Sequence, residues 1–287
     1  MPSGILIIDK PQGWTSMDVC AKLRGLFHER RVGHAGTLDP MATGVLPVFL
    51  GRATRAVEFA AGGDKEYVAG LRLGLVTDTQ DITGTVLDAR PARVTREELE
   101  GALPAFRGEI RQLPPMYSAV KVAGKKLYEL ARKGREVERT PRPVTIRALE
   151  VEGQGGEGEF TLRVVCSKGT YVRTLCHDIG QALGCGGCMA SLRRTMAAGY
   201  TLADAHPLEE VLTAPDPGAL LLPVDSCFRH LPELTLTAAQ EKRVRNGAAF
   251  SFEQEGSWRA YSQSGEFLAV CRGAEGQLRT VKSFFEV

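Results

Sequence analysis

Apolar residues are spaced in two ways along the first two thirds of the chain. The continuous apolar run at 45–50 is typical of a buried strand. The stretch 65–73 alternates instead, so that every second side chain, from Tyr67 to Leu73, lies on one face. Patterns of these kinds predict four strands, at 4–9, 45–50, 65–73 and 159–166.

Helices are predicted where a residue that typically caps a helix is followed by apolar residues at helical spacing. Thr15 or Ser16 caps a helix to about Phe27, in which Val19 and Leu23 share one face. Thr95 and Glu98 form a capping box for a helix to about 103, and Thr170 is the expected N-cap of an apolar stripe that ends at 183. Shorter helices are predicted at 51–59 and 126–133.

The pattern changes again near Asp225, where we place a domain boundary. Beyond it, Thr237 and Gln240 form another capping box, for a helix that Asn246 and Gly247 end. Short strands joined by glycine-bearing turns follow at 258–261, 267–272 and 278–285. The sequence therefore predicts a first domain over 1–225 and a small β-rich domain over 226–287.

Composition excludes several classes of protein. The 287 residues are 43% hydrophobic and carry a net charge of only +2, so any nucleic-acid site must be a local patch. No apolar run approaches the roughly 20 residues of a membrane helix, and the start of the chain lacks the pattern of a signal peptide. We therefore expect a cytoplasmic protein without a membrane partner.

Seven cysteines, an odd number, do not suggest a secreted disulfide framework. Cys185 and Cys188 form a C-x-x-C pair, but a structural zinc site normally needs a second pair at similar spacing, and the sequence has none. A thioredoxin-like role lacks the strand and helix context that it requires. No metal ligand is therefore predicted.

The stretch 33–44 (GHAGTLDPMATG) concentrates the candidate chemistry. Three glycines and Pro40 shape a loop ahead of the apolar run, and Asp39 is pushed towards an extended conformation. Asp before Pro is also ordinary turn chemistry. From the residues alone, Asp39 is either a turn former or a carboxylate held at a constrained point.

This stretch resembles the catalytic motif of the TruB-type pseudouridine synthases, G-H-x-G-T-L-D-P-x-A-x-G, at every defined position. Four further stretches resemble family motifs in the family's order: 10–16, 65–67, 169–175 and the Leu-Arg-Arg-Thr strand at 192–195. The chain departs from the family pattern at 185–188 and 196–200. The resemblance implies an α+β fold, with a mixed, largely antiparallel central sheet flanked by helices and a PUA-like C-terminal domain.

The resemblance also assigns expected roles to individual residues. Asp39 is the expected catalytic carboxylate, and Arg173, an unfavourable cation in a first helical turn, is expected to pair with it and keep it ionised. The target uridine must leave its stack to reach Asp39. The remaining expected substrate contacts are Lys10, His34 at the vacated space, Tyr67 stacked on the base, and Tyr171 and Leu192 lining the base pocket.

A basic segment lies within 112–143, a region that begins with a proline-rich stretch unsuited to regular structure. Its cations include Arg132, Lys133, Arg135 and Arg139, with Arg142 and Arg147 close by. They form either a solvated face or a phosphate-binding patch. The family carries an RNA-gripping insertion here, which favours the second interpretation, with the insertion ordered only on RNA.

The resemblance implies a stand-alone, monomeric tRNA pseudouridine synthase that isomerises the T-loop uridine, position 55 in the family. It needs the T-stem-loop of tRNA but no cofactor, metal or protein partner. The alternatives are a guide-RNA-dependent relative, which usually has long basic extensions and lacks the insertion, an RNA-binding or RNA-folding module without catalysis, and an aspartyl-phosphate enzyme. The sequence leaves open whether Asp39 attacks the base, attacks C1′ or removes the C2′ proton.

Overall fold

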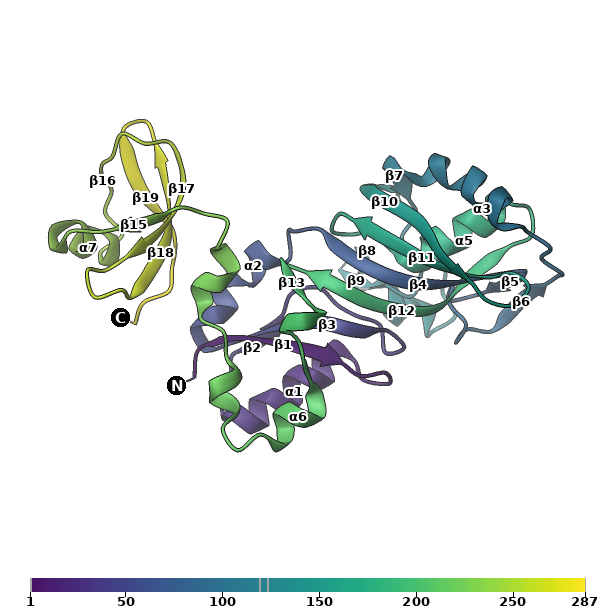
Figure 1. Cartoon of the computed structure of the whole chain (residues 1–287), viewed down its shortest axis with the longest axis horizontal. Helices are drawn as coiled ribbons and strands as arrows, with labels where there is room; N and C mark the ends of the chain where they lie inside the picture. Colours follow the sequence, from purple (N-terminus) through teal and green to yellow (C-terminus); the bar gives the residue numbers. More distant parts are fainter. Residues whose placement is uncertain (1, 119, 123, 287) are drawn as a thin grey trace.

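The computed structural model describes residues 2–118, 120–122 and 124–286. It contains a large ten-stranded sheet and a separate five-stranded sheet near the C-terminus, linked by a segment of short helical turns (Figure 1). No described helix is long and apolar enough to cross a membrane.

The large sheet runs in the order β14-β1-β3-β12-β4-β11-β10-β7. Two more strands join it outside this order: β2 pairs with β3, and β13 pairs with β12. Most neighbours are antiparallel, whereas β1 pairs with β14 and β12 pairs with β3 in parallel. The predicted mixed, largely antiparallel sheet is confirmed. Its strands are β1 (Gly4–Lys10), β2 (Val32–His34), β3 (Thr43–Leu50), β4 (Lys65–Leu73), β7 (Gly108–Gln112), β10 (Arg142–Gln154), β11 (Glu159–Cys166), β12 (Gly187–Ala197), β13 (Tyr200–Thr201) and β14 (His206–Pro207).

Helices cover this sheet where the sequence presents apolar stripes. In α1 (Ser16–Phe27), Thr15 caps the N-terminus through a capping box, and Val19, Leu23 and Phe27 are buried as predicted. The other helical segments are η1 (Gly51–Ala56), α2 (Val57–Ala60), α3 (Arg96–Ala102), η2 (Leu103–Phe106), α4 (Leu127–Ala131), α5 (Val172–Ala182), η3 (Leu202–Asp204), α6 (Leu208–Thr213), η4 (Pro217–Leu220) and η5 (Val224–Phe228).

Three sequence predictions need correction here. Strand β10 was not predicted, because two register shifts against β11 break its alternation. Tyr171, not Thr170, is the N-cap of α5, and the Thr170 hydroxyl donates to the carbonyl of Ser167 instead. Within the insertion, α4 is shorter than the predicted helix at 126–133. Residues 119 and 123, which belong to the insertion predicted at 112–143, lie outside the described residues.

Two small hairpins project from the large sheet: β5 (Leu75–Thr77) with β6 (Val86–Ala89), and β8 (Lys121–Val122) with β9 (Lys125–Lys126). The first hairpin encloses the loop 78–85, which lies against β12: Ile82 N donates to the Met189 carbonyl and Met189 N to the Gln80 carbonyl. These backbone bonds fix the loop beside the central strands.

The C-terminal sheet has its own core, with buried Leu236, Ala260, Leu268 and Leu278. An aromatic cluster joins this part to the first: Phe228 lies 5.3 Å from Phe59 and 5.6 Å from Phe284 between ring centroids. The predicted β-rich C-terminal unit is therefore present. Its elements are β15 (Glu233–Thr235), α7 (Ala238–Arg245), β16 (Phe250–Ser251), β17 (Gly256–Tyr261), β18 (Phe267–Ala274) and β19 (Gln277–Ser283).

Candidate active site

The loop between β2 and β3 presents Asp39 and is fixed by α1 and the turn before it. The Leu38 amide donates to Ser16 Oγ at 2.9 Å, and the Gly13 amide donates to the Pro40 carbonyl at 2.8 Å. Asp39 does form a turn, since its carbonyl accepts from Ala42 N at 3.0 Å. The turn-former interpretation is thus correct for the backbone, and it leaves the carboxylate free for other partners.

Lys10 lies under this loop rather than on its surface. Its side chain is fully buried, and Nζ donates to the carbonyls of Trp14 at 2.6 Å, Pro11 at 2.9 Å and Pro40 at 3.4 Å. Burial lowers the pKa of Lys10 to about 8 despite the Asp39 carboxylate nearby. This geometry supports a role in holding the residue after Asp39, and direct contact of Lys10 with a substrate remains a prediction.

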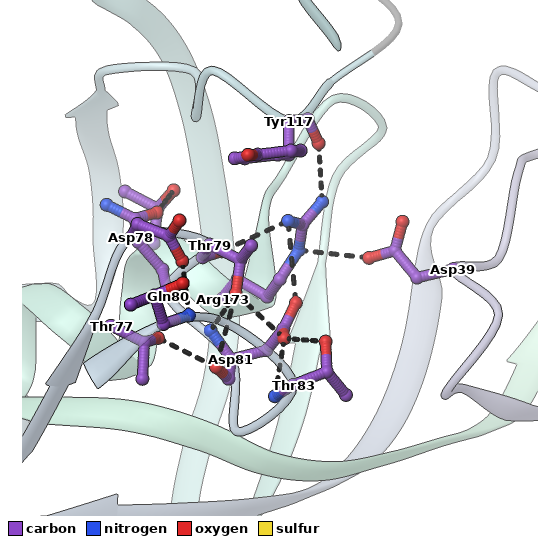
Figure 2. A network of polar contacts seen from close by, with 11 residues as sticks. Asp39, Thr77, Asp78, Thr79, Gln80, Asp81, Thr83, Tyr117 and Arg173 are labelled. Carbon is purple, nitrogen blue, oxygen red and sulfur yellow. Dashed lines mark hydrogen bonds and ion pairs between the residues drawn. The ribbon is translucent and has the colours of Figure 1, made fainter. Parts of the chain in front are cut away.

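Arg173 forms the expected ion pair with Asp39. Its Nε lies 3.0 Å from Asp39 Oδ2, and the Arg173 side chain is only 7% exposed, whereas that of Asp39 is 37% exposed (Figure 2). Arg173 Nη2 donates to the Tyr117 carbonyl at 2.8 Å and Nη1 to the Thr79 carbonyl at 3.1 Å. The guanidinium is therefore held rigidly from three sides while the carboxylate stays open on one.

Asp81 is a functional candidate that the sequence analysis missed. Its side chain is 7% exposed, and Oδ2 lies 3.6 Å from Arg173 Nη1. Oδ1 accepts from the hydroxyl of Thr83 at 2.6 Å and from that of Thr79 at 2.9 Å (Figure 2). The available signal in the sequence was the polar, glycine-closed stretch at 77–84 around Asp81.

Opposing effects set the charge of Asp39. Desolvation raises the pKa of Asp39 and outweighs the Arg173 guanidinium, which lowers it; Asp81 adds to the increase. The expectation that Arg173 favours the ionised form is correct in direction, but the net shift of the Asp39 pKa is upward because desolvation is the larger effect. Asp39 is consequently a stronger base than an ordinary surface aspartate.

Tyr67 and Leu192 lie beside this centre on neighbouring strands. Tyr67 is 6% exposed on β4, and Leu192 is 8% exposed on β12 and pairs with Ala69 of β4. Burial raises the pKa of the Tyr67 hydroxyl, while the charge of Arg194 opposes the increase. Stacking of Tyr67 on a base remains a prediction, as does the contact of Leu192 with it.

His34 and Tyr171 flank the site from β2 and from the start of α5. The Nδ1 atom of His34 is buried without a hydrogen-bond partner among the described residues, and burial lowers the pKa of His34, helped by the charge of Arg194. The Tyr171 amide donates to Gln112 Oε1 at 2.9 Å, so the start of α5 is tied to the end of β7. A neutral His34 is suited to hydrogen bonding with a nucleotide.

Three basic residues of the insertion, Arg132, Lys133 and Arg135, are exposed. Arg132 lies over the Tyr128 ring, 5.4 Å from its centroid, whereas Lys133 and Arg135 make no ion pair with any described residue. Arg139 differs: its side chain is 17% exposed and donates to the Pro114 carbonyl and to Glu136. Arg147 pairs with Asp64. The exposed cations of the predicted patch that make no ion pair with a described residue are thus Arg132, Lys133, Arg135 and Arg142.

The C-x-x-C pair belongs to no metal-binding cluster among the described residues. Cys185 and Cys188 are both buried, and burial raises the pKa of Cys188 to about 11. Among the described residues, no group of three or more His, Cys, Asp or Glu is placed to hold a metal ion. The C-x-x-C pair is best described as part of the core.

Comparison with known families agrees with this geometry. Residues 24–172 match the model of the TruB family pseudouridylate synthase N-terminal domain, and residues 173–229 match the tRNA pseudouridylate synthase B C-terminal domain. Among solved structures, the chain is similar to one in a Cbf5-Nop10-Gar1 complex, with 26% identity and a TM-score of 0.74 over 98% of this chain and 85% of that one.

Curated relatives are closer in sequence. The tRNA pseudouridine synthase B of Azoarcus sp. (strain BH72) is 46% identical over 280 residues, which cover 96% of this chain and 93% of that protein. The protein of the same name from Clostridium kluyveri is 39% identical over 98% of this chain and 99% of its own length. The fold, the loop that carries Asp39 and these similarities together show that this chain belongs to the TruB family of pseudouridine synthases.

Proposed function

We propose that this chain isomerises the uridine at position 55 in the T-loop of tRNA to pseudouridine, with Asp39 as the catalytic carboxylate. The observation that carries the proposal is the 3.0 Å pair between Asp39 and a buried Arg173, in which the carboxylate alone remains open to a ligand. A tRNA pseudouridine synthase needs one such carboxylate near sugar and base.

The reaction conserves every atom of the substrate. The bond from uracil N1 to C1′ breaks, the base turns, and C5 bonds to C1′; the proton lost from C5 is balanced by one gained at N1. Asp39 acts as nucleophile or base, and its raised pKa suits either role. No oxidant, reductant or transferred group enters this balance.

The uridine must be turned out of the folded T-loop before Asp39 can reach it. In our proposal Tyr67 offers its aromatic face to the extracted base, Leu192 and Tyr171 complete the pocket, and His34 occupies or borders the space that the base leaves. These side chains come from β4, β12, the start of α5 and β2, so they surround Asp39 from several directions.

Arg173 and Asp81 orient the carboxylate in this scheme. Arg173 reaches Asp39 through Nε and Asp81 through Nη1, while the hydroxyls of Thr79 and Thr83 fix Asp81. Because all these groups are held before substrate arrives, little reorganisation is required at the moment of reaction. Removing either partner should therefore lower the rate more than the affinity for tRNA.

In our proposal, other parts of the chain bind the tRNA. We assign Arg132, Lys133 and Arg135 to backbone phosphates and the unit 226–287 to RNA binding as a PUA-like domain, which together with the catalytic unit 1–225 would recognise the T-stem-loop. We also propose that the enzyme acts as a monomer without a guide RNA or protein partner, in the cytoplasm where tRNA is found.

The direct test is incubation of the purified chain with unmodified tRNA, without added metal or guide, followed by mapping of pseudouridine. We expect one modified site, at position 55, and no product from a tRNA with cytidine there. Modification only after a guide RNA is added would favour the guide-dependent alternative, and tight tRNA binding without product would favour a non-catalytic RNA-binding module.

A further inference from the structure

Arg194 occupies the centre of the large sheet, in the part of β12 that lies between β3 and β4. It pairs with Gly44 of the parallel strand β3 and with Tyr67 of the antiparallel strand β4. Its side chain is fully buried. A single residue therefore stands between the loop that carries Asp39 and the strand that carries Tyr67.

The guanidinium of Arg194 binds both ends of the segment around Asp39. Nη2 donates to the Gly36 carbonyl at 3.1 Å, three residues before Asp39, and Nε donates to the Val45 carbonyl at 2.7 Å, six residues after it. Both acceptors are backbone atoms, so these bonds fix the course of the chain on the two sides of the carboxylate.

The surrounding glycines are fitted to this side chain. A Cβ at Gly36, whose φ is +87°, would stand 3.3 Å from Arg194 Nη1 and 3.1 Å from Lys65 Cε. A Cβ at Gly44, whose φ is +98°, would collide with the Arg194 backbone. The loop can approach β12 this closely only because neither position carries a side chain.

The charge of Arg194 is costly for stability where it lies. It forms no ion pair with any described residue, and Nη1 has no hydrogen-bond acceptor there although it is buried. The groups that face it are cationic or neutral: Lys65, which is bound to the Ala61 and Gly63 carbonyls, His34 and the Tyr67 hydroxyl. An apolar side chain of similar volume would fill this space at lower cost.

We infer that Arg194 is a positioning residue for the isomerisation, which fixes the carboxylate of Asp39 relative to the ring of Tyr67. The inference rests on the proposed function and adds a residue that touches neither base nor sugar. Alignment of the reacting atoms is sensitive to small shifts, and a displacement of about 1 Å can cost roughly 100-fold in rate. A guanidinium that binds both sides of the loop is suited to preventing such a shift.

The test is a single-turnover measurement with tRNA at saturating enzyme, comparing Arg194→Met, Arg194→Lys and wild type. The folded fraction of each variant is measured separately by circular dichroism, and the rate is taken at the plateau that no longer rises with enzyme concentration, because misplacement lowers this plateau whereas partial unfolding does not. Arg193→Met is the matched control: it removes a cation from the adjacent position, where Arg193 is 43% exposed and pairs with Asp9.

We expect Arg194→Met to reach full amplitude with unchanged tRNA affinity and a rate lower by roughly 100-fold. Arg194→Lys, which keeps the charge and one of the two carbonyl bonds, should fall between it and wild type, and Arg193→Met should match wild type. If Arg194→Met does not fold, the single-turnover rate of Arg194→Lys is compared with wild type instead. A plateau rate near that of wild type for Arg194→Met, or loss of the folded state in both variants, would overturn the inference, whereas inactive wild type would instead contradict the proposed function.

Discussion

Cations are used in opposite ways at the active site and in the insertion. Around Asp39, the buried side chains of Lys10, Arg173 and Arg194 each donate hydrogen bonds to at least two backbone carbonyls. In the insertion, Lys133 and Arg135 lie exposed and make no ion pair with a described residue. The first arrangement fixes geometry, and the second leaves charge available to phosphates.

The contrast suggests that catalysis and tRNA binding depend on different cations and can be changed separately. Buried cations bonded to the backbone define where a carboxylate points, and they act within a few ångströms in a medium of low dielectric constant. Exposed cations act through the ionic atmosphere and are screened by salt. Substitutions in the two regions should therefore change different measured quantities.

The largest effect is expected for Asp39→Asn. The neutral isostere removes the nucleophile or base, so the single-turnover rate should fall by at least about 10³-fold. Affinity for tRNA should stay near that of wild type, because no phosphate contact changes. Asp88→Asn is the control, since Asp88 pairs with Arg90 on the β5–β6 hairpin, and it should react normally. A rate near wild type for Asp39→Asn would refute the catalytic assignment.

Replacing Arg173 by Gln tests the proposal that a buried cation orients the Asp39 carboxylate. We expect a rate loss of roughly 100-fold, because Asp39 loses its anchor. The acid limb of kcat/KM should also move. Asp39 must be ionised to act, and its folded pKa is raised, so activity is lost as the pH falls through a value above that of an ordinary aspartate.

Without the Arg173 charge, the pKa of Asp39 should rise further and the acid limb should shift to higher pH. A pH profile of both enzymes with the same tRNA measures this shift. An acid limb that moves to lower pH, or does not move, would show that another group controls the ionisation.

A smaller effect is expected from the exposed cations. Joint replacement of Arg132, Lys133 and Arg135 by Ala should weaken tRNA binding and reduce the slope of log affinity against log salt by roughly 2 to 3. Arg93→Ala is the control, because Arg93 is 89% exposed near α3 and carries the same charge. An unchanged slope for the triple variant would mean that these cations form only a solvated face.

The smallest effect is expected from thiol reagents and chelators. Cys185 and Cys188 are buried, and the raised pKa of Cys188 leaves little thiolate at neutral pH. Alkylation under native conditions and treatment with a chelator should leave the rate within about twofold of untreated enzyme. Loss of activity that zinc alone restores would contradict this prediction.

Local pattern predicted the elements better than their long-range partners. The helix α1 and the strand β4 follow from periodicity and capping within a dozen residues, and both were predicted with their buried faces. Strand β10 was missed because its register shifts destroy the period of two. Periodicity carries information only while the strand stays regular.

In the active site, too, residues with local or family signals were predicted, whereas long-range contacts were not. The Asp39–Arg173 pair was predicted from the family resemblance and from an unfavourable cation at the start of a helix. Asp81 was missed, because the threonines around it look like a polar loop and its contact with Arg173 spans 92 positions in the sequence. Arg194 was missed because an arginine in an alternating strand ordinarily points to solvent.

The most direct test of the separation between catalysis and tRNA binding is to measure how the single-turnover rate depends on enzyme concentration, at low and at moderate salt. It compares Arg173→Gln, the triple variant of Arg132, Lys133 and Arg135, and their combination. We predict that Arg173→Gln lowers the plateau rate at unchanged half-saturation and that the triple variant raises half-saturation at an unchanged plateau. The combined variant should show both changes at full size. A triple variant with a collapsed plateau at normal half-saturation would contradict this separation, because the insertion would then shape the active site.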